Sequence, residues 1–153
     1  MIKRRKIRHN LKKYLPNLKE IFKNQEGIIA AYLFGSYAKG APSPLSDIDI
    51  AYLLDESLFK EKAEEIDTNL YSSISSYLQT DEISFICLNK APLSIKYAVI
   101  SSGKVLFSSD ESKRVEFEEK TMDMYIDTQP IRHEYFNYLF KKIKEDNFGY
   151  RYK

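Results

Sequence analysis

Residues 28–54 read IIAAYLFGSYAKGAPSPLSDIDIAYLL and contain two apolar runs separated by a small-residue and proline-containing stretch. The first run, residues 28–34, is short and uninterrupted and follows a glycine, which predicts a buried strand rather than a helix. The second run, residues 47–54, is apolar apart from two acids at its start, and it predicts a second strand. We therefore expect two adjacent strands whose connection lies at one end of a sheet.

The connection itself carries turn signals. Gly35-Ser36 ends the first strand, and residues 37–40 are predicted to form a short helical turn. Residues 41–46 contain two prolines, which predicts a loop. Each of these parts is common by itself. Their order is informative as a combination: a strand, Gly-Ser, a helical turn, a loop, and then a strand that begins with acids.

Two acids, Asp47 and Asp49, open the second strand. Side chains alternate between the faces of a strand, so these two carboxylates are expected to point the same way and to lie within a few ångströms of each other. Like charges that close repel unless a cation lies between them. Mg²⁺ is bound by one or two carboxylates together with waters and substrate phosphates, so the pair is a candidate Mg²⁺ site. The alternative is a solvent-facing strand edge without a metal.

The Gly35-Ser36 turn is a candidate phosphate-binding site. Backbone N–H groups at such a turn can hold a phosphate, glycine permits close approach of the backbone, and the Ser36 hydroxyl adds a donor. Lys39, one turn later, is close enough in sequence to approach the phosphates; its alternative is a solvated helix residue. A cation site beside a phosphate site predicts binding of a nucleoside triphosphate.

The rest of the chain predicts a small α/β (or α+β) domain with a mixed sheet of three or four strands packed by helices. The first predicted helix covers residues 7–25 and is kinked at Pro16 or broken after Leu15. It is followed, after the two strands described above, by a helix over residues 57–78, a strand over 83–88, a helix from Pro92 to an end cap at Gly103, and a strand over 104–107. Two more helices complete the chain: one is opened by the capping-box sequence of residues 108–111 and ends near Ile126, and the last begins at Pro130.

Composition restricts the class of protein. The chain has 153 residues, 43% hydrophobic and 30% charged, which predicts one folded domain over residues 1–153 and excludes a disordered chain. The chain has a single cysteine, Cys87, which excludes an internal disulfide framework and a cysteine-based zinc site. Because Cys87 lies in a predicted apolar strand, we expect its thiol to be buried in the core. The absence of an apolar run of membrane-spanning length and of a secretory signal leads us to expect a cytoplasmic protein.

Charge is distributed unevenly along the chain. Residues 1–13 carry a net charge of +7, residues 141–153 carry +3, and the stretch between them carries −8. A basic N-terminal arm of about residues 1–9 is therefore expected outside a core of about residues 10–149. The arm is interpreted as a solvated tail, with contact to RNA or to an acidic partner surface as the alternative.

Three further features have simpler interpretations. His9 and His133 are isolated in sequence, have no metal-ligand spacing and are expected at the surface. The last helix carries more aromatic residues than one buried face requires, and it is either packed in the core or presented to a partner. Those aromatic residues are Tyr135, Phe136, Tyr138 and Phe140.

The two halves of the motif, residues 33–40 (LFGSYAKG) and 46–50 (SDIDI), resemble the signature of the minimal nucleotidyltransferases of the DNA polymerase β superfamily. The chain is also similar to the antitoxin branch of that superfamily, whose members pair with HEPN ribonuclease toxins. This similarity lies in residues 88–92 (LNKAP), in residues 103–107 (GKVLF) and in the ending over residues 125–149. The resemblance covers most of residues 28–149.

The resemblance implies the polymerase β-like fold and an ATP-dependent adenylyltransferase that needs Mg²⁺. Asp47 and Asp49 would bind the metal, Gly35 and Ser36 would hold the triphosphate with Lys39 nearby, and AMP would pass to a tyrosine hydroxyl of a HEPN toxin in a hetero-oligomer. Two alternatives stay open: an antitoxin that masks its toxin without chemistry, and a small-molecule nucleotidyltransferase.

One departure from the family pattern concerns a third carboxylate on the next strand. Aligning on Leu88-Asn89 puts Ser84 at that position, and a hydroxyl is a poor base. Glu82 shares the strand face but lies about 7 Å further along by strand rise. The alternatives are a weakened activity, a base supplied by Glu82 or by the acceptor protein, and a different register.

Overall fold

The computed structural model describes residues 11–42 and 46–145, and its centre is a four-stranded sheet of order β3-β2-β1-β4. The basic arm and His9 lie outside the described residues. β1 pairs antiparallel with β2 and with β4, whereas β2 pairs parallel with β3, so the predicted mixed sheet is confirmed. The strands are β1 (Ile28–Phe34), β2 (Ile48–Leu54), β3 (Ile83–Cys87) and β4 (Lys104–Ser108).

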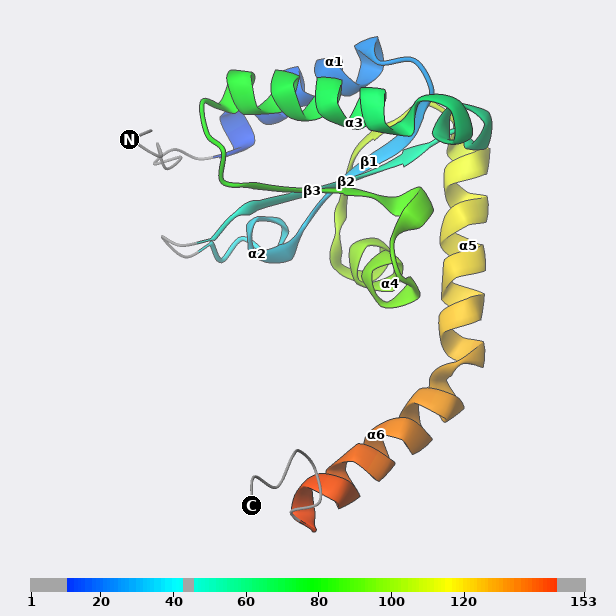
Figure 1. The fold of residues 1–153 in the computed structure, drawn as a ribbon. Coiled ribbons are helices and arrows are strands. Elements are labelled where there is room, and N and C mark those ends of the chain that lie inside the picture. The colour runs from blue at the N-terminus through cyan, green and yellow to red at the C-terminus, as the bar shows by residue number, and fades with distance from the viewer. Residues whose placement is uncertain (1–10, 43–45, 146–153) are drawn as a thin grey trace.

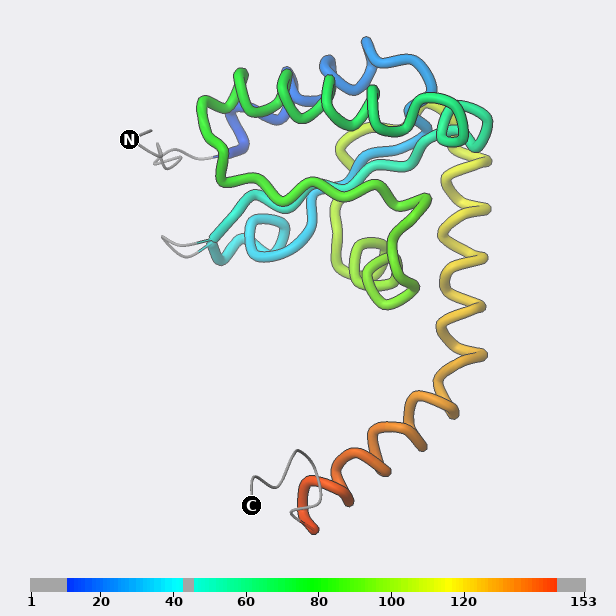
Figure 2. Tube along the Cα trace, viewed as in Figure 1, coloured from blue at the N-terminus to red at the C-terminus, as the bar shows by residue number. Residues whose placement is uncertain are grey.

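Helices cover both faces of this sheet. In Figure 1, α1 and α3 lie along one face, α4 lies on the other, α5 runs down one side, and α6 continues away from the sheet. The same path can be followed as a trace in Figure 2. The helical elements are η1 (Leu11–Lys13), α1 (Leu15–Asn24), α2 (Gly35–Ala38), α3 (Glu56–Leu78), η2 (Leu88–Lys90), α4 (Leu93–Ser102), α5 (Glu111–Asp127) and α6 (Gln129–Lys144).

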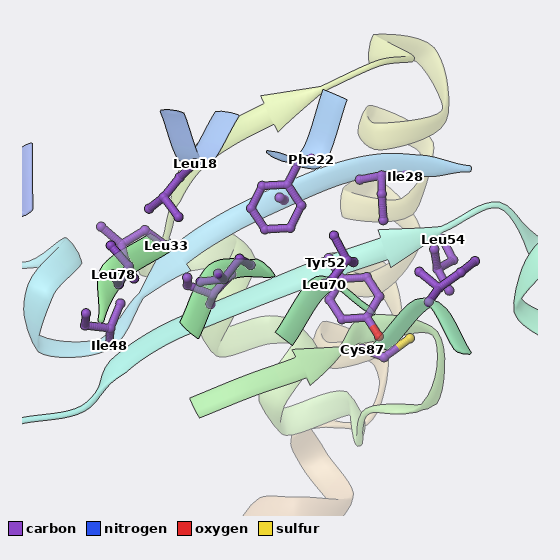
Figure 3. Packing of buried hydrophobic residues seen from close by; sticks show 14 of the residues in the cluster. Leu18, Phe22, Ile28, Leu33, Ile48, Tyr52, Leu54, Leu70, Leu78 and Cys87 are labelled. Carbon is purple, nitrogen blue, oxygen red and sulfur yellow. The ribbon is translucent and has the colours of Figure 1, made fainter. Parts of the chain in front are cut away.

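The two faces of β2 serve different parts of the core. Its even-numbered residues join a cluster under α1 and α3, where Tyr52 packs near Phe22 and Leu70 (Figure 3). Its odd-numbered residues Ala51 and Leu53 belong to a second cluster under α4. Because side chains alternate along a strand, Asp49 belongs to the α4 face of the sheet.

The first predicted helix is divided, and the position of the break differs from the expectation. A 3₁₀ turn and α1 meet at Tyr14, one residue before the predicted break after Leu15, and α1 ends at Asn24. Pro16 lies in the first turn of α1 rather than inside a long helix. Proline is tolerated there because the N–H that it lacks has no intrahelical acceptor at that position.

Four predicted boundaries are also corrected. α2 begins at Gly35 instead of residue 37, and Asp47 lies just before β2 instead of within it. The third strand ends at Cys87 because Leu88 starts a 3₁₀ turn. Pro92 precedes α4 as its cap residue, with an extended ψ of 153°, and is not its first helical residue.

α5 is tied to the sheet by side-chain contacts. Asp110 caps its N-terminus by accepting from the Lys113 N–H, and the Lys113 ammonium pairs with Asp55 at 2.9 Å. The buried Tyr32 of β1 donates its hydroxyl to Glu118 at 2.8 Å, and burial raises the pKa of that hydroxyl. These contacts fix the direction in which α5 leaves the domain.

The Asn89 side chain of η2 hydrogen-bonds to the main chain of β2 at the point where β3 has already ended. Its Oδ1 accepts from the Leu54 N–H at 2.8 Å, and its Nδ2 donates to the Leu54 carbonyl at 2.9 Å. Leu54 is buried, so its main-chain groups have no access to water as a substitute. The Asn89 side chain therefore continues the hydrogen bonding along β2 beyond the end of β3.

We expect Asn89→Ala to lower the free energy of unfolding by about 3 kcal/mol, because it leaves two buried main-chain groups without partners. Urea denaturation followed by circular dichroism measures this loss. The control is Lys90→Ala, an exposed neighbour in the same turn, expected to stay within about 0.5 kcal/mol of the parent chain. Equal effects of the two substitutions would contradict the role given to Asn89.

Two simpler expectations are confirmed. Cys87 is a buried free thiol whose pKa is raised by burial, and His133 is exposed on α6. Among the described helices none combines the length and the apolar character needed to cross a membrane.

Candidate active site

Three strand ends meet at one edge of the sheet. Phe34, the last residue of β1, lies opposite Asp49 in the antiparallel register, and Asp49 lies beside Ser84 in the parallel register of β2 and β3. Gly35 follows Phe34 directly as the first residue of α2. The fold thus brings Gly35, Asp49 and Ser84 together from three separate parts of the chain.

Gly35 makes room for the Asp49 carboxylate. Its φ is +68°, a conformation that side-chain-bearing residues rarely adopt. A Cβ placed on Gly35 would lie only 2.0 Å from Asp49 Oδ2 and 3.0 Å from Asp49 Cγ. Both the backbone conformation and the neighbouring carboxylate therefore require glycine. Sequence reasoning missed this packing, because no local pattern reports a contact between the two strands.

The start of α2 presents main-chain donors. The Lys39 N–H donates to the Gly35 carbonyl at 3.2 Å, which is the first hydrogen bond of this helical turn. The N–H groups of Ser36, Tyr37 and Ala38 precede it and have no intrahelical acceptor. Such a turn favours an anion. Lys39 is exposed at the end of α2, and within the described ranges its ammonium makes no hydrogen bond or ion pair with Asp47 or Asp49.

The two acids influence each other. Asp47 is exposed just before β2, and Asp49 is half-buried. Burial raises the pKa of Asp49, the negative charge of Asp47 raises it further, and a hydrogen bond with the Ser84 side chain opposes both. Part of the electrostatic strain is therefore a direct repulsion between two nearby carboxylates, which a cation would relieve.

Ser84 is the neighbour of Asp49 on β3, and Glu82 is not. Glu82 lies before β3, where its main-chain carbonyl accepts from the Ile48 N–H at 3.0 Å. Over residues 11–42 and 46–145 there is no cluster of three histidine, cysteine or acidic side chains able to hold a metal ion. The part of the chain that the structure describes therefore offers a pair of carboxylates with a serine hydroxyl beside it.

The chemistry of this donor set fits Mg²⁺ bound together with a nucleotide. Two carboxylates repel each other at the sheet edge, and the ion takes oxygen ligands from one or two carboxylates while waters and phosphates complete its coordination. The N–H groups at the start of α2, which have no intrahelical acceptor, lie next to this pair of acids and suit the phosphates.

Comparison with protein families gives a match over most of the described fold. Residues 16–112 match the model of the polymerase beta nucleotidyltransferase family. This range contains the whole sheet, from the start of α1 to the start of α5.

Among characterised proteins, the chain is similar to the protein adenylyltransferase MntA of Shewanella oneidensis. The two are 32% identical over 101 residues, which cover 66% of this chain and 68% of the relative.

Solved structures extend the similarity beyond the family match. A toxin–antitoxin structure with AMP-PNP shares 26% identity and superposes with a TM-score of 0.66 over 84% of this chain and 98% of the other. A structure of the tri-AMPylated HEPN toxin of Shewanella oneidensis in complex with its MNT antitoxin contains a chain with 25% identity and a TM-score of 0.61, covering 86% of this chain and 96% of the other.

Proposed function

The chain belongs to the polymerase beta nucleotidyltransferase family, and from this premise we propose that it is a protein adenylyltransferase that silences a HEPN ribonuclease toxin. The observation that carries the proposal is the convergence of Gly35 and the Asp47–Asp49 pair at one edge of the sheet. The similarity to MntA, and to antitoxin structures with AMP-PNP or with an AMPylated toxin, supports ATP as the donor and a toxin as the acceptor.

In the proposed reaction, an oxygen of a toxin tyrosine forms a bond to the α-phosphorus of ATP. The bond between that phosphorus and the bridging oxygen of the β-phosphate breaks, pyrophosphate leaves, and the hydroxyl proton passes to solvent water. The N–H groups at the start of α2 and the Ser36 hydroxyl would orient the triphosphate. Gly35 keeps side-chain atoms out of the space that the Asp49 carboxylate needs.

Asp47 and Asp49 would hold Mg²⁺, which supplies charge neutralisation on the phosphates. A hydrogen bond with the Ser84 side chain favours the ionised form of Asp49 and so opposes the effect of burial, which raises the pKa of this carboxyl. We place Lys39 near the triphosphate as a second positive charge, and we place the reaction in the cytoplasm, where ATP is supplied.

The direct test incubates the purified chain with ATP, Mg²⁺ and the product of the gene next to its own, which we propose to be the HEPN toxin. We expect the toxin to gain mass in steps of one AMP moiety, on tyrosine, and to lose ribonuclease activity as it does so. A toxin that binds the chain but gains no mass would exclude adenylyl transfer.

Ser84 favours a second candidate function. The parallel pairing puts a hydroxyl, not a carboxylate, beside Asp49, and a hydroxyl is a poor base for an acceptor proton. The same fold would then act as an antitoxin by masking its toxin. Loss of the two acids would leave neutralisation intact in that case, and this distinguishes the two functions.

A further inference from the structure

Helix α6 presents large apolar side chains to solvent along its length. None of its residues is buried. Six large apolar side chains are more than half exposed, from 52% at Phe136 to 69% at Ile131. We call these six residues the α6 surface: Ile131, Tyr135, Phe136, Tyr138, Phe140 and Ile143. Of the two interpretations of this helix in the sequence, packing in the core is wrong.

The α6 surface is large enough for a stable interface. Its members form two neighbouring rows with spacings of four and three residues, Ile131-Tyr135-Tyr138 and Phe136-Phe140-Ile143. Together the rows cover a wide arc of the helix, and the remaining side carries His133, Asn137 and Lys141. At half exposure each side chain offers on the order of 100 Å². The total approaches the roughly 800 Å² that each partner buries in a standard protein interface. Apolar patches of this size on a soluble protein mark interaction sites.

The helix is held at a defined angle, so its surface has a fixed place relative to the domain. The rings of Tyr97 in α4 and Tyr125 in α5 stack with centroids 3.5 Å apart and planes 1° apart. The guanidinium of Arg132 in α6 lies 3.5 Å from the centroid of the Tyr125 ring and donates to the Tyr125 carbonyl at 2.6 Å. These three residues join α4, α5 and α6 into one support.

Helices α5 and α6 also extend on the side of the sheet that carries Asp49. Asp49 belongs to the face covered by α4, and Figure 1 shows α5 and α6 descending past α4 on that same side. A protein seated on α6 is therefore on the face of the sheet to which Asp49 belongs.

We propose that the α6 surface is the docking site for the acceptor protein, the HEPN toxin, and this inference rests on the proposed function. The charges beside the α6 surface indicate what kind of toxin surface would bind there. Lys141, Lys142 and Lys144 occupy the last turn of α6, and the Lys142 ammonium lies 5.3 Å from the Tyr138 ring centroid. The complementary surface on the toxin is an apolar groove with an acidic rim.

The test compares two double variants of α6 that add the same amount of negative charge. Tyr135→Asp with Tyr138→Asp changes the α6 surface, and His133→Asp with Asn137→Asp changes the opposite side of the same helix. All four side chains are exposed, so circular dichroism should show both variants folded. We expect the tyrosine variant to weaken toxin binding at least about 100-fold by calorimetry, and the control to bind within about 3-fold of the parent chain.

The outcomes separate this inference from the proposed function. If the parent chain transfers AMP and the tyrosine variant binds and transfers equally well, the docking site is wrong and the proposed function stands. If the free chain is a dimer by light scattering and only the tyrosine variant is a monomer with toxin affinity unchanged, a second copy covers α6 and the inference fails. If the parent chain neither binds nor modifies the toxin, the proposed function fails and the docking site fails with it.

Discussion

Replacing both acids, Asp47→Asn with Asp49→Asn, should lower the rate of AMP transfer to the toxin by on the order of 10³-fold or more. The substitution keeps the shape of both side chains but removes the charges proposed to hold Mg²⁺, whose neutralisation of phosphate charge contributes several kcal/mol to the transition state. The measurement is a time course of radiolabel incorporation from ATP into the toxin at saturating Mg²⁺.

The control for this variant is Glu64→Gln with Glu65→Gln, which removes two negative charges from the exposed side of α3 and should transfer AMP at the parent rate. The acid variant should still fold and bind the toxin, because neither side chain is part of the core or of α6. Full neutralisation of the toxin in growing cells by the acid variant would show that catalysis is dispensable and that masking is the function.

The second large effect is expected for Gly35→Ala. The new methyl group would lie 2.0 Å from Asp49 Oδ2, so the carboxylate or the turn must move by about 1 Å or more. A displacement of that size at a reacting centre can cost on the order of 100-fold in rate. The positive φ of +68° adds a loss of stability of about 1 kcal/mol.

Gly40→Ala is a closely matched control for that substitution. Gly40 has a similar φ of +72°, but a Cβ there would meet no heavy atom of the described residues within 4 Å. It should therefore show the same conformational cost in urea denaturation without the loss of AMP transfer. Equal transfer rates for the two variants would mean that the contact between Gly35 and Asp49 has no part in the reaction.

The strands and the acid pair were predictable because their signals are local. Short apolar runs predicted β1 and β2, and the glycine–serine pair with the two acids marked the edge at which they meet. The pairing of Asp49 with Ser84 also agrees with the alignment on Leu88-Asn89. Such features depend on residue types at short spacing, which a sequence displays directly.

Other features depend on contacts between distant segments. The spacing of Ile131, Tyr135 and Tyr138 predicts an amphipathic helix, but it cannot show whether another part of the chain covers it. The two hydrogen bonds of Asn89 and the stacking of Arg132 on Tyr125 have no local signature either. Helix boundaries at Pro16 and Pro92 differ because proline fits both a first turn and a cap position.

The mixed pairing of the sheet has a consequence for the order of folding. β1 and β2 are neighbours in sequence and pair antiparallel, so they can close early, whereas β3 joins β2 in parallel only after the whole of α3 has crossed over. Ser84 consequently reaches Asp49 through the slow, long-range step of loop closure. A nascent chain that has made only its first hairpin already carries both acids, but it acquires the third strand of the site only when the crossover is complete.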